Sequence, residues 1–390
     1  MGNNRLLIVF RNLFIAAALA VTLLTIVLLG FIFVAYGNRS GLNPVEAFFL
    51  NISLALRSAD LSRPLGADPA PVCFTVNRGD SAGSIAARLA EQGFAVDPDL
   101  FRNYVRFFGI DDELQAGVFS LRRTFTLPEV AQQLTNAGAN TVNFLIPEGW
   151  RLEEIAARID ATPGLNFTGA DFVALVGPGA GSIPGAIGEF AARVGLPPGR
   201  SLEGFLFPDT YTLPACGTAA DLVLRMLQNF DARVTAQMRA DAQATGLSLY
   251  QIVTLGAIVQ RETLIAEEGP VIAGVYLNRY RNAGRAAPDP RIPVTLDADP
   301  TIQYALGNTR DPATWWPPLT RADYRGVDSP YNTYLYAGLP PGPIANPGLN
   351  AIRSAIYPQQ HEYAFFRTCA GDGGRHRFSL TFEEHAAACP

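Results

Sequence analysis

Apolar residues are concentrated near the N-terminus, where residues 13–36 (LFIAAALAVTLLTIVLLGFIFVAY) carry no charged side chain. A helix rises about 1.5 Å per residue and needs roughly 20 apolar residues to cross a bilayer, so this stretch is long enough to span one. A cleaved signal peptide is the alternative, but its apolar core usually has about 7–15 residues, and no clear A-x-A cleavage site follows here. We therefore predict an uncleaved transmembrane helix.

Basic residues around this helix predict its orientation. Arg5 and Arg11 precede it in a very short segment, whereas only Arg39 follows closely. Because basic flanks stay in the cytoplasm, residues 1–12 are predicted to be cytoplasmic and the chain after residue 37 to be outside. The sequence thus predicts a single-pass protein of the plasma membrane.

A second pattern occurs twice. FTVNRGDSAGSIAARL at residues 74–89 recurs as FLIPEGWRLEEIAARI at residues 144–159, with Gly79 matching Gly149. Each copy predicts a short alternating strand, a glycine turn and an amphipathic helix. Residues 37–70, before the first copy, combine a short apolar juxtamembrane segment with a Pro-containing linker. The chain after the membrane helix is therefore predicted to have an α+β fold.

A third pattern is a helical stripe that ends on a carboxylate. Ser248 followed by Gln251 is typical of a capping box at the start of a helix. Apolar residues then recur at helical spacing, at Ile252, Leu255 and Val259. The next position on this stripe is Glu262.

Glu262 has two interpretations. On a low-dielectric face the charged form of the carboxyl group is disfavoured, which raises its pKa and suits a general acid. Alternatively, Glu262 forms an ion pair with Arg261 or Arg279, or lies at the exposed end of the helix. Glycosidases typically use two carboxylates, but Glu262 has no acidic partner on its own helix face. Only the fold could bring one near, from Glu203, Asp209, Asp297 or Asp299, so a mechanism with a single acid fits better.

Composition narrows the choice of partners. The formal net charge is −5, so we predict no nucleic-acid partner. All four cysteines lie after the apolar helix, where disulfides can form, and they allow three connectivities. Among Cys73, Cys216, Cys369 and Cys389, the favoured pair is Cys369 with Cys389, because these two bracket the C-terminal segment. With three histidines, no C-x-x-C spacing and no phosphate-loop lysine, we predict neither a metal site nor a cofactor.

Six segments follow one another in the second half of the chain: LEGFLFPDTYTL (202–213), LGAIVQRET (255–263), VYLNRY (275–280), LDADPTIQYALG (296–307), SPYNTYLYAGLPPGPIANPG (329–348) and HRFSLTFEEH (376–385). Together they resemble the YceG-like (MltG) family of endolytic murein transglycosylases. The resemblance implies a mixed α/β catalytic domain at residues 199–390, preceded by a connecting strand–turn–helix unit at residues 141–198. The first copy of the repeat is also similar to a glycan-binding LysM module, which implies a LysM-like subdomain at residues 71–140. A small α+β spacer without a ligand is the alternative for that subdomain.

The resemblance also implies a catalytic residue. The family's catalytic glutamate lies in a segment written A-S-I-[VI]-E-K-E, which reads GAIVQRE here, so Gln260 replaces the first acid and Ala257 the serine. Glu262 is the remaining carboxylate, and its implied role is that of general acid and base. The implied reaction cuts the β-1,4 bond between N-acetylmuramic acid and N-acetylglucosamine in nascent glycan strands and leaves 1,6-anhydro ends. The implied cellular role is termination of glycan elongation beside the peptidoglycan synthases.

The same resemblance implies a set of substrate contacts. Tyr331 and Tyr334 are expected to offer faces for sugar rings, and Asn332 and Thr333 to offer hydrogen bonds. Gln303 and Glu203 complete the predicted substrate-binding residues. The alternative for these residues is a structural one, a loop shaped by its prolines and packed tyrosines. The alternatives for the function are an inactive glycan-binding scaffold and a water-using muramidase that pairs Glu262 with a second carboxylate.

Overall fold

A computed structural model describes residues 3–36, 41–139, 141–214, 216–310 and 314–389. The chain forms two compact units: Met1–Thr141 with Pro214–Cys216, and Val142–Leu213 with Gly217–Pro390. Arg39, which entered the orientation argument, and residue 140, the predicted end of the LysM-like segment, lie outside the described residues.

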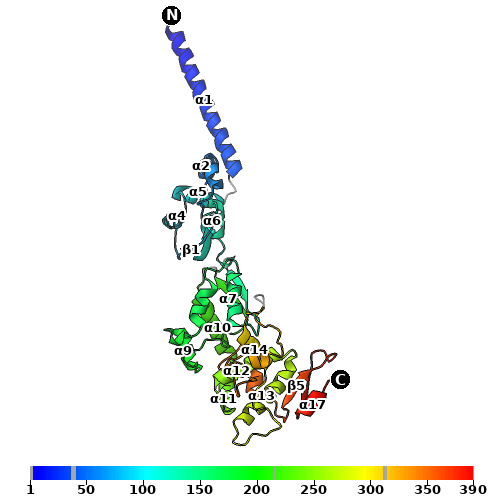
Figure 1. The fold of residues 1–390 in the computed structure, drawn as a ribbon. Helices are drawn as coiled ribbons and strands as arrows, with labels where there is room; N and C mark the ends of the chain where they lie inside the picture. The colour runs from blue at the N-terminus through cyan, green and yellow to red at the C-terminus, as the bar shows by residue number, and fades with distance from the viewer. Residues whose placement is uncertain (1–2, 37–40, 140, 215, 311–313, 390) are drawn as a thin grey trace. The chain divides into compact units, whose positions relative to one another are not determined.

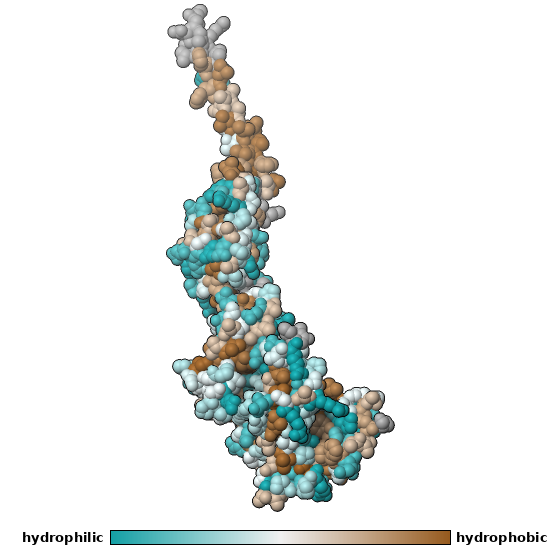
Figure 2. Space-filling model, in the orientation of Figure 1, coloured by the Kyte–Doolittle hydropathy of each residue, from teal (hydrophilic) through white to brown (hydrophobic). Residues whose placement is uncertain are grey.

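The first unit begins with the apolar helix α1 (Asn3–Tyr36). Its segment Phe10–Ala35 is long and apolar enough to cross a membrane, and its apolar side chains cover its surface in Figure 2. Phe14 and Val34, for example, are 76% and 86% exposed. Such a surface is stable when hydrocarbon covers it, so α1 fits a single-pass anchor.

The rest of the first unit is a small α+β fold around one antiparallel pair of strands. Its elements are α2 (Pro44–Leu56), α3 (Ser58–Ser62), β1 (Pro71–Val76), α4 (Ala82–Glu91), α5 (Pro98–Phe108), η1 (Asp111–Glu113), β2 (Gly117–Arg122), α6 (Leu127–Gln133) and η2 (Ala137–Ala139). β1 pairs with β2 from Pro71↔Arg122 to Val76↔Gly117. Phe74 and Phe119 face each other in this register, and both are fully buried. A disulfide joins Cys73 in β1 to Cys216.

The second unit is mostly helical and has two further pairs of strands (Figure 1). Its elements are β3 (Thr141–Leu145), α7 (Leu152–Asp160), α8 (Gly169–Val176), η3 (Ala180–Ser182), α9 (Ala186–Arg193), β4 (Thr210–Pro214), α10 (Ala219–Arg233), α11 (Ala236–Ala244), α12 (Leu249–Glu262), η4 (Ala266–Glu268), α13 (Gly269–Ala283), α14 (Asp299–Leu306), α15 (Asp323–Gly326), α16 (Leu349–Ile356), β5 (Phe365–Thr368), β6 (His376–Ser379) and α17 (Phe382–Ala387). β3 pairs with β4, and β5 with β6. The predicted mixture of helix and sheet after an apolar N-terminal helix is confirmed.

Both copies of the repeat form the predicted strand, turn and helix. Gly79 links β1 to α4, and Gly149 links β3 to α7. Both glycines have positive φ, +88° and +78°, which a side chain would strain. The repeated glycine therefore marks a turn that needs it in each copy.

The core of the second unit surrounds α12. All residues from Ile252 to Val259 are buried, and α16 and α13 pack against this helix. Phe205 packs against Phe230 and Tyr250 in the same core, with ring centroids 5.1 and 6.1 Å away. α12 is thus a rigid central support.

Asn346, in the GPIANPG segment, links three parts of this unit. It is fully buried, and its side-chain oxygen accepts hydrogen bonds from Gly204 N at 2.8 Å and Leu206 N at 3.2 Å. Its side-chain nitrogen donates to Trp150 O at 3.0 Å. Its backbone also exchanges hydrogen bonds with Gly149 and Trp150. One side chain therefore fixes the proline-rich loop against two distant segments.

The predicted disulfide at the C-terminus is confirmed, because Cys369 is joined to Cys389. The bond closes a segment that contains β6 and α17 and holds both beside β5. This segment supplies one wall of the cavity described next.

Candidate active site

α12 starts and ends as its sequence predicts. The Ser248 side chain accepts from Gln251 N at 3.2 Å, and the Gln251 side chain accepts from Ser248 N at 2.9 Å, which completes a capping box. Ile252, Leu255 and Val259 are at most 1% exposed. Glu262 is the last residue of the helix.

The Glu262 side chain lies in a cavity of about 500 Å³ within the second unit. Its walls come from α12, α13, the segment before α14, the loop around Tyr334, and the C-terminal strands. The lining residues are Glu262, Tyr276, Arg279, Asp297, Asp299, Tyr324, Tyr334, Phe366, Arg367, Thr368, His376 and His385. The cavity thus combines acids, hydrogen-bond donors and aromatic rings.

The environment of Glu262 favours the protonated acid. Burial raises its pKa to about 7, the hydrogen bond from Tyr276 opposes this rise, and the negative charge of Asp299 adds to it. The Tyr276 hydroxyl donates to Glu262 Oε1 at 2.8 Å. A carboxyl group with such a pKa keeps a large share of its proton near neutral pH.

Neither arginine named in the alternative interpretation forms an ion pair with Glu262 in the described part of the chain. Arg261 stacks on Trp316, with its guanidinium carbon 3.8 Å from the ring centroid. Arg279 donates to Leu296 O at 2.5 Å, to Ala364 O at 2.7 Å and to Asp297 Oδ2 at 3.3 Å. Both arginines lower the pKa of Glu262, but their effects are smaller than those of burial, the Tyr276 hydrogen bond and Asp299.

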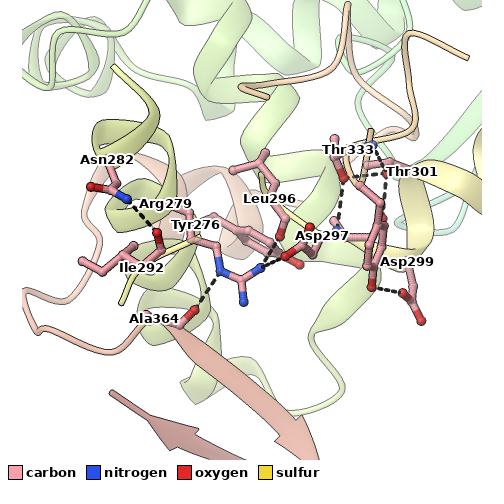
Figure 3. A network of polar contacts seen from close by, with 12 residues as sticks. Tyr276, Arg279, Asn282, Ile292, Leu296, Asp297, Asp299, Thr301, Thr333 and Ala364 are labelled. Carbon is pink, nitrogen blue, oxygen red and sulfur yellow. Dashed lines mark hydrogen bonds and ion pairs between the residues drawn. The ribbon is translucent and has the colours of Figure 1, made fainter. Parts of the chain in front are cut away.

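Two further carboxylates, Asp297 and Asp299, line the same cavity. Figure 3 shows both of them in a network of polar contacts. Asp299 accepts hydrogen bonds from Tyr334 at 2.6 Å and Tyr324 at 3.2 Å. Asp297 has a positive φ of +50°, which is costly for a residue with a side chain, and burial raises its pKa. Arg279 donates to the Asp297 carboxylate, so each of the three acids in the cavity accepts at least one hydrogen bond.

Among the predicted substrate-binding residues, Tyr334 lines the cavity, whereas its neighbours Asn332 and Thr333 are turned inward. Asn332 is fully buried and donates to Tyr324 O and Val327 O. The Thr333 hydroxyl accepts a hydrogen bond from Ala298 N and shares another with the Thr301 hydroxyl. These two side chains therefore shape the loop, whereas they were predicted to contact the substrate. The prediction failed because polar residues in a motif do not reveal which side chains the backbone turns inward.

The other predicted residues form a separate cluster. Glu203 is 2% exposed, accepts from Leu152 N at 2.8 Å and from the Tyr304 hydroxyl at 2.5 Å, and has its pKa raised to about 7 by burial. Tyr331 packs on Tyr304, with ring centroids 4.7 Å apart. Gln303 donates to Pro317 O at 3.0 Å. Glu203 therefore lies in a packed interior, although the sequence made it a candidate second carboxylate.

Sequence reasoning did not assign Tyr276 or His376 to the site, and it named Arg279 only as a possible ion-pair partner of Glu262. Tyr276 and Arg279 are three residues apart on α13, so they share a helix face, and the VYLNRY segment offered this signal. His376 also lines the cavity, and its ring nitrogen Nδ1 lies 2.7 Å from Glu268 Oε2. No local pattern could pair these two residues, which are far apart in the sequence. Among the described residues, no group of three or more His, Cys, Asp and Glu side chains is arranged to hold a metal ion.

Comparison with known proteins identifies the family to which this chain belongs. The profile of the YceG-like family matches residues 74–389. A Bacillus subtilis protein named endolytic murein transglycosylase is 27% identical over 325 residues, which cover 81% of this chain and 83% of that protein. A Streptococcus pneumoniae protein of the same name is 25% identical over 310 residues, 76% of this chain and 54% of that protein. A solved yceG-like protein from Listeria monocytogenes has 26% identity and a TM-score of 0.52, covering 81% of this chain and 98% of that one.

Proposed function

Because this chain belongs to the YceG-like family and is a murein transglycosylase, we propose that it cleaves the β-1,4 bond between N-acetylmuramic acid and N-acetylglucosamine, with Glu262 as catalytic residue. The observation that carries this proposal is the Glu262 carboxyl group, with a pKa of about 7, inside a cavity large enough for sugar residues. Nascent glycan strands are its substrate, and cleavage ends their elongation.

The reaction needs two proton transfers, one from Glu262 to the leaving oxygen and one from the substrate back to Glu262. Protonated Glu262 gives its proton to the glycosidic oxygen as the bond from this oxygen to the anomeric carbon of the muramoyl residue breaks. The 6-hydroxyl oxygen of the same muramoyl residue then bonds to that carbon, and its proton passes to the Glu262 carboxylate. The acid is restored, no water is consumed, and the product ends in a 1,6-anhydro ring. Ring closure within one sugar is fast once the cavity holds the hydroxyl over the carbon.

Tyr276 has a positioning role in this cycle. Its hydroxyl donates to Glu262 Oε1, so the proton of the acid belongs on the other oxygen, which is free to reach the substrate. The same hydrogen bond stabilises the carboxylate that forms after proton transfer. Tyr276 is itself fully buried, which fixes the direction of the bond.

A hydrolytic muramidase is the second candidate, because Asp299 lines the same cavity as Glu262. A retaining or inverting hydrolase uses two carboxylates, one of which attacks the sugar or activates water. Both oxygens of Asp299 already accept tyrosine hydroxyls. This engagement favours the single-acid reaction.

Product analysis distinguishes the two reactions. Purified full-length protein in detergent is incubated with uncrosslinked peptidoglycan strands, and the products are reduced with borohydride and weighed by mass spectrometry. Anhydromuramoyl ends resist reduction and are the expected product. Reducing muramic acid ends would overturn the proposal in favour of hydrolysis, and an absence of products would indicate an inactive scaffold.

The pH profile follows from the pKa of Glu262. The free enzyme must hold the proton, so kcat/KM should be constant well below pH 7 and fall about tenfold per pH unit above it. Glu203 also has a pKa raised to about 7, but it lies outside the cavity. The profile is therefore expected to persist in a Glu203→Gln variant, and a profile that depends on Glu203 would contradict this assignment.

Location follows from α1, which fits a single-pass anchor. We propose the orientation predicted from the flanking arginines, with a cytoplasmic N-terminus and the second unit outside the cytoplasm. In this orientation the second unit is on the same side of the membrane as newly made strands and the peptidoglycan synthases.

A further inference from the structure

A second chamber adjoins the cavity of Glu262. It has a volume of about 730 Å³, and the two spaces share Arg279, Asp297, Tyr334, Phe366 and His385 as lining residues. They are therefore neighbouring parts of one cleft within the second unit. The proposed chemistry at Glu262 uses only the inner part.

The far wall of this outer chamber carries charged side chains, which uncharged sugars do not need for binding. It is formed by Pro290, Arg291, Pro293, Phe382 and Glu383. Arg291 is bonded to Asp289, and its side chain is 75% exposed, while Glu383 is exposed on the opposite segment. With Arg279 and Asp297 at the junction, the chamber offers charged side chains of both signs.

Exposed apolar surface accompanies these charges. Phe382 is 63% exposed, and its ring lies 6.1 Å from that of Phe365 and 6.2 Å from that of His385. An aromatic ring left this open in a concave site indicates a ligand with alkyl groups or flat faces. The ligand should therefore be charged and partly apolar.

The wall that carries Phe382 and Glu383 is held in place. The Cys369–Cys389 disulfide closes the segment, β5 pairs with β6 from Phe365↔Ser379 to Thr368↔His376, and the Thr381 side chain caps α17. A wall fixed before binding loses little conformational entropy when a ligand arrives. This is the behaviour of a binding site.

We propose that the outer chamber binds the peptide stem of the substrate, a short zwitterionic peptide with free carboxylates, an amine and alkyl side chains. The inference rests on the proposed function. The stem leaves the muramoyl residue through its lactyl group, to the side of the glycan chain, so a chamber that opens beside the reacting sugar can receive it. In intact strands the glycan residues carry no formal charge, because the lactyl carboxyl group is amide-linked to the stem, whereas the charged groups of the stem can form ion pairs with exposed side chains such as Arg291 and Glu383.

The test compares two substrates, one that carries the stem and one in which a free lactyl carboxylate replaces it. Uncrosslinked strands are used intact or after an amidase has removed the peptides, and kcat/KM is measured with the full-length protein. Arg291→Ala and Phe382→Ala should each lower kcat/KM on intact strands by about five- to tenfold, mainly through KM, because they remove binding and not chemistry. On stripped strands the same variants should match the wild type.

The control is Arg325→Ala, which removes an exposed arginine that does not line either chamber. It should leave both substrates unaffected, and the melting temperatures of all variants should match that of the wild type. If the wild type does not cut stripped strands, the proposal is judged from intact strands alone. It then requires that Arg291→Ala and Phe382→Ala lower kcat/KM on intact strands while Arg325→Ala does not.

Two results would overturn the proposal. Equal losses on intact and stripped strands would assign the chamber to the glycan, and no loss on either would show that it does not bind substrate. Failure of the proposed function looks different, because anhydro ends would then be missing from the products of the wild type itself.

Discussion

Replacing Glu262 by glutamine is expected to lower glycan cleavage by about 10²–10⁴-fold, the contribution of a general acid and base. The amide can still accept the hydrogen bond from Tyr276, so the shape of the cavity is kept while the mobile proton is lost. The measurement is kcat/KM on uncrosslinked strands with the full-length variant. Activity within tenfold of the wild type would refute the assignment.

The matched control for this variant is Glu267→Gln, which neutralises an exposed carboxylate shortly after the same helix. It should cleave as the wild type does. Equal losses in the two variants would show that net charge matters and not the acid at the end of α12.

Stability provides an independent readout of Glu262→Gln. The native pKa of about 7 lies above the usual 4.5, so the native state binds this proton more tightly than the unfolded chain does. The stabilisation from this proton is fully present below pH 4.5 and is lost as the pH rises through about 7, where the ionised group costs up to about 3 kcal/mol. The variant should therefore gain stability relative to the wild type between pH 5 and 8 in denaturant titrations.

Replacing Asn346 by alanine is expected to cost the second unit about 3–5 kcal/mol of unfolding free energy. The change leaves Gly204 N and Leu206 N without their acceptor and removes a donor to Trp150 O. Each buried group without a partner costs about 1–3 kcal/mol, and the lost side chain also leaves a void. Chemical denaturation of the detergent-solubilised chain measures this difference.

Asn350→Ala is the control for this loss, because Asn350 is an exposed asparagine shortly after Asn346. Its effect should stay within about 0.5 kcal/mol. If the two variants were equally stable, the buried hydrogen bonds of Asn346 could not be what fixes the proline-rich loop.

Local patterns predicted the elements that depend on local physics. The capping box and apolar stripe of α12 followed from residues 248–262, and α1 from its length without charge. The two strand–turn–helix copies were predicted from their repeated glycine. In both copies this glycine lies in a turn with positive φ, which favours glycine over other residues. The position of Glu262 on the stripe left two interpretations open, and its raised pKa supports the one in which it is a general acid.

The sequence could not identify the partners of Glu262, because they come from other elements, and Asp299 was only one of four candidate acids. Tyr276 reaches it from α13, and Asp299 from the start of α14. Nor could the sequence tell that Asn332 and Thr333 point into the protein, since burial in a loop depends on the backbone path and not on side-chain polarity. The proposed reacting bond came from the family resemblance, and the outer chamber could be found only from the fold.

The place of Glu262 at the last turn of α12 has an electrostatic consequence of its own. The peptide dipoles of a helix sum to a partial negative charge at its C-terminal end, equivalent to about half an elementary charge. An anion is repelled there, whereas a neutral carboxyl group is not. The backbone that carries the acid therefore helps to retain its hydrogen, and the same residue at the opposite pole of the helix would release it more readily.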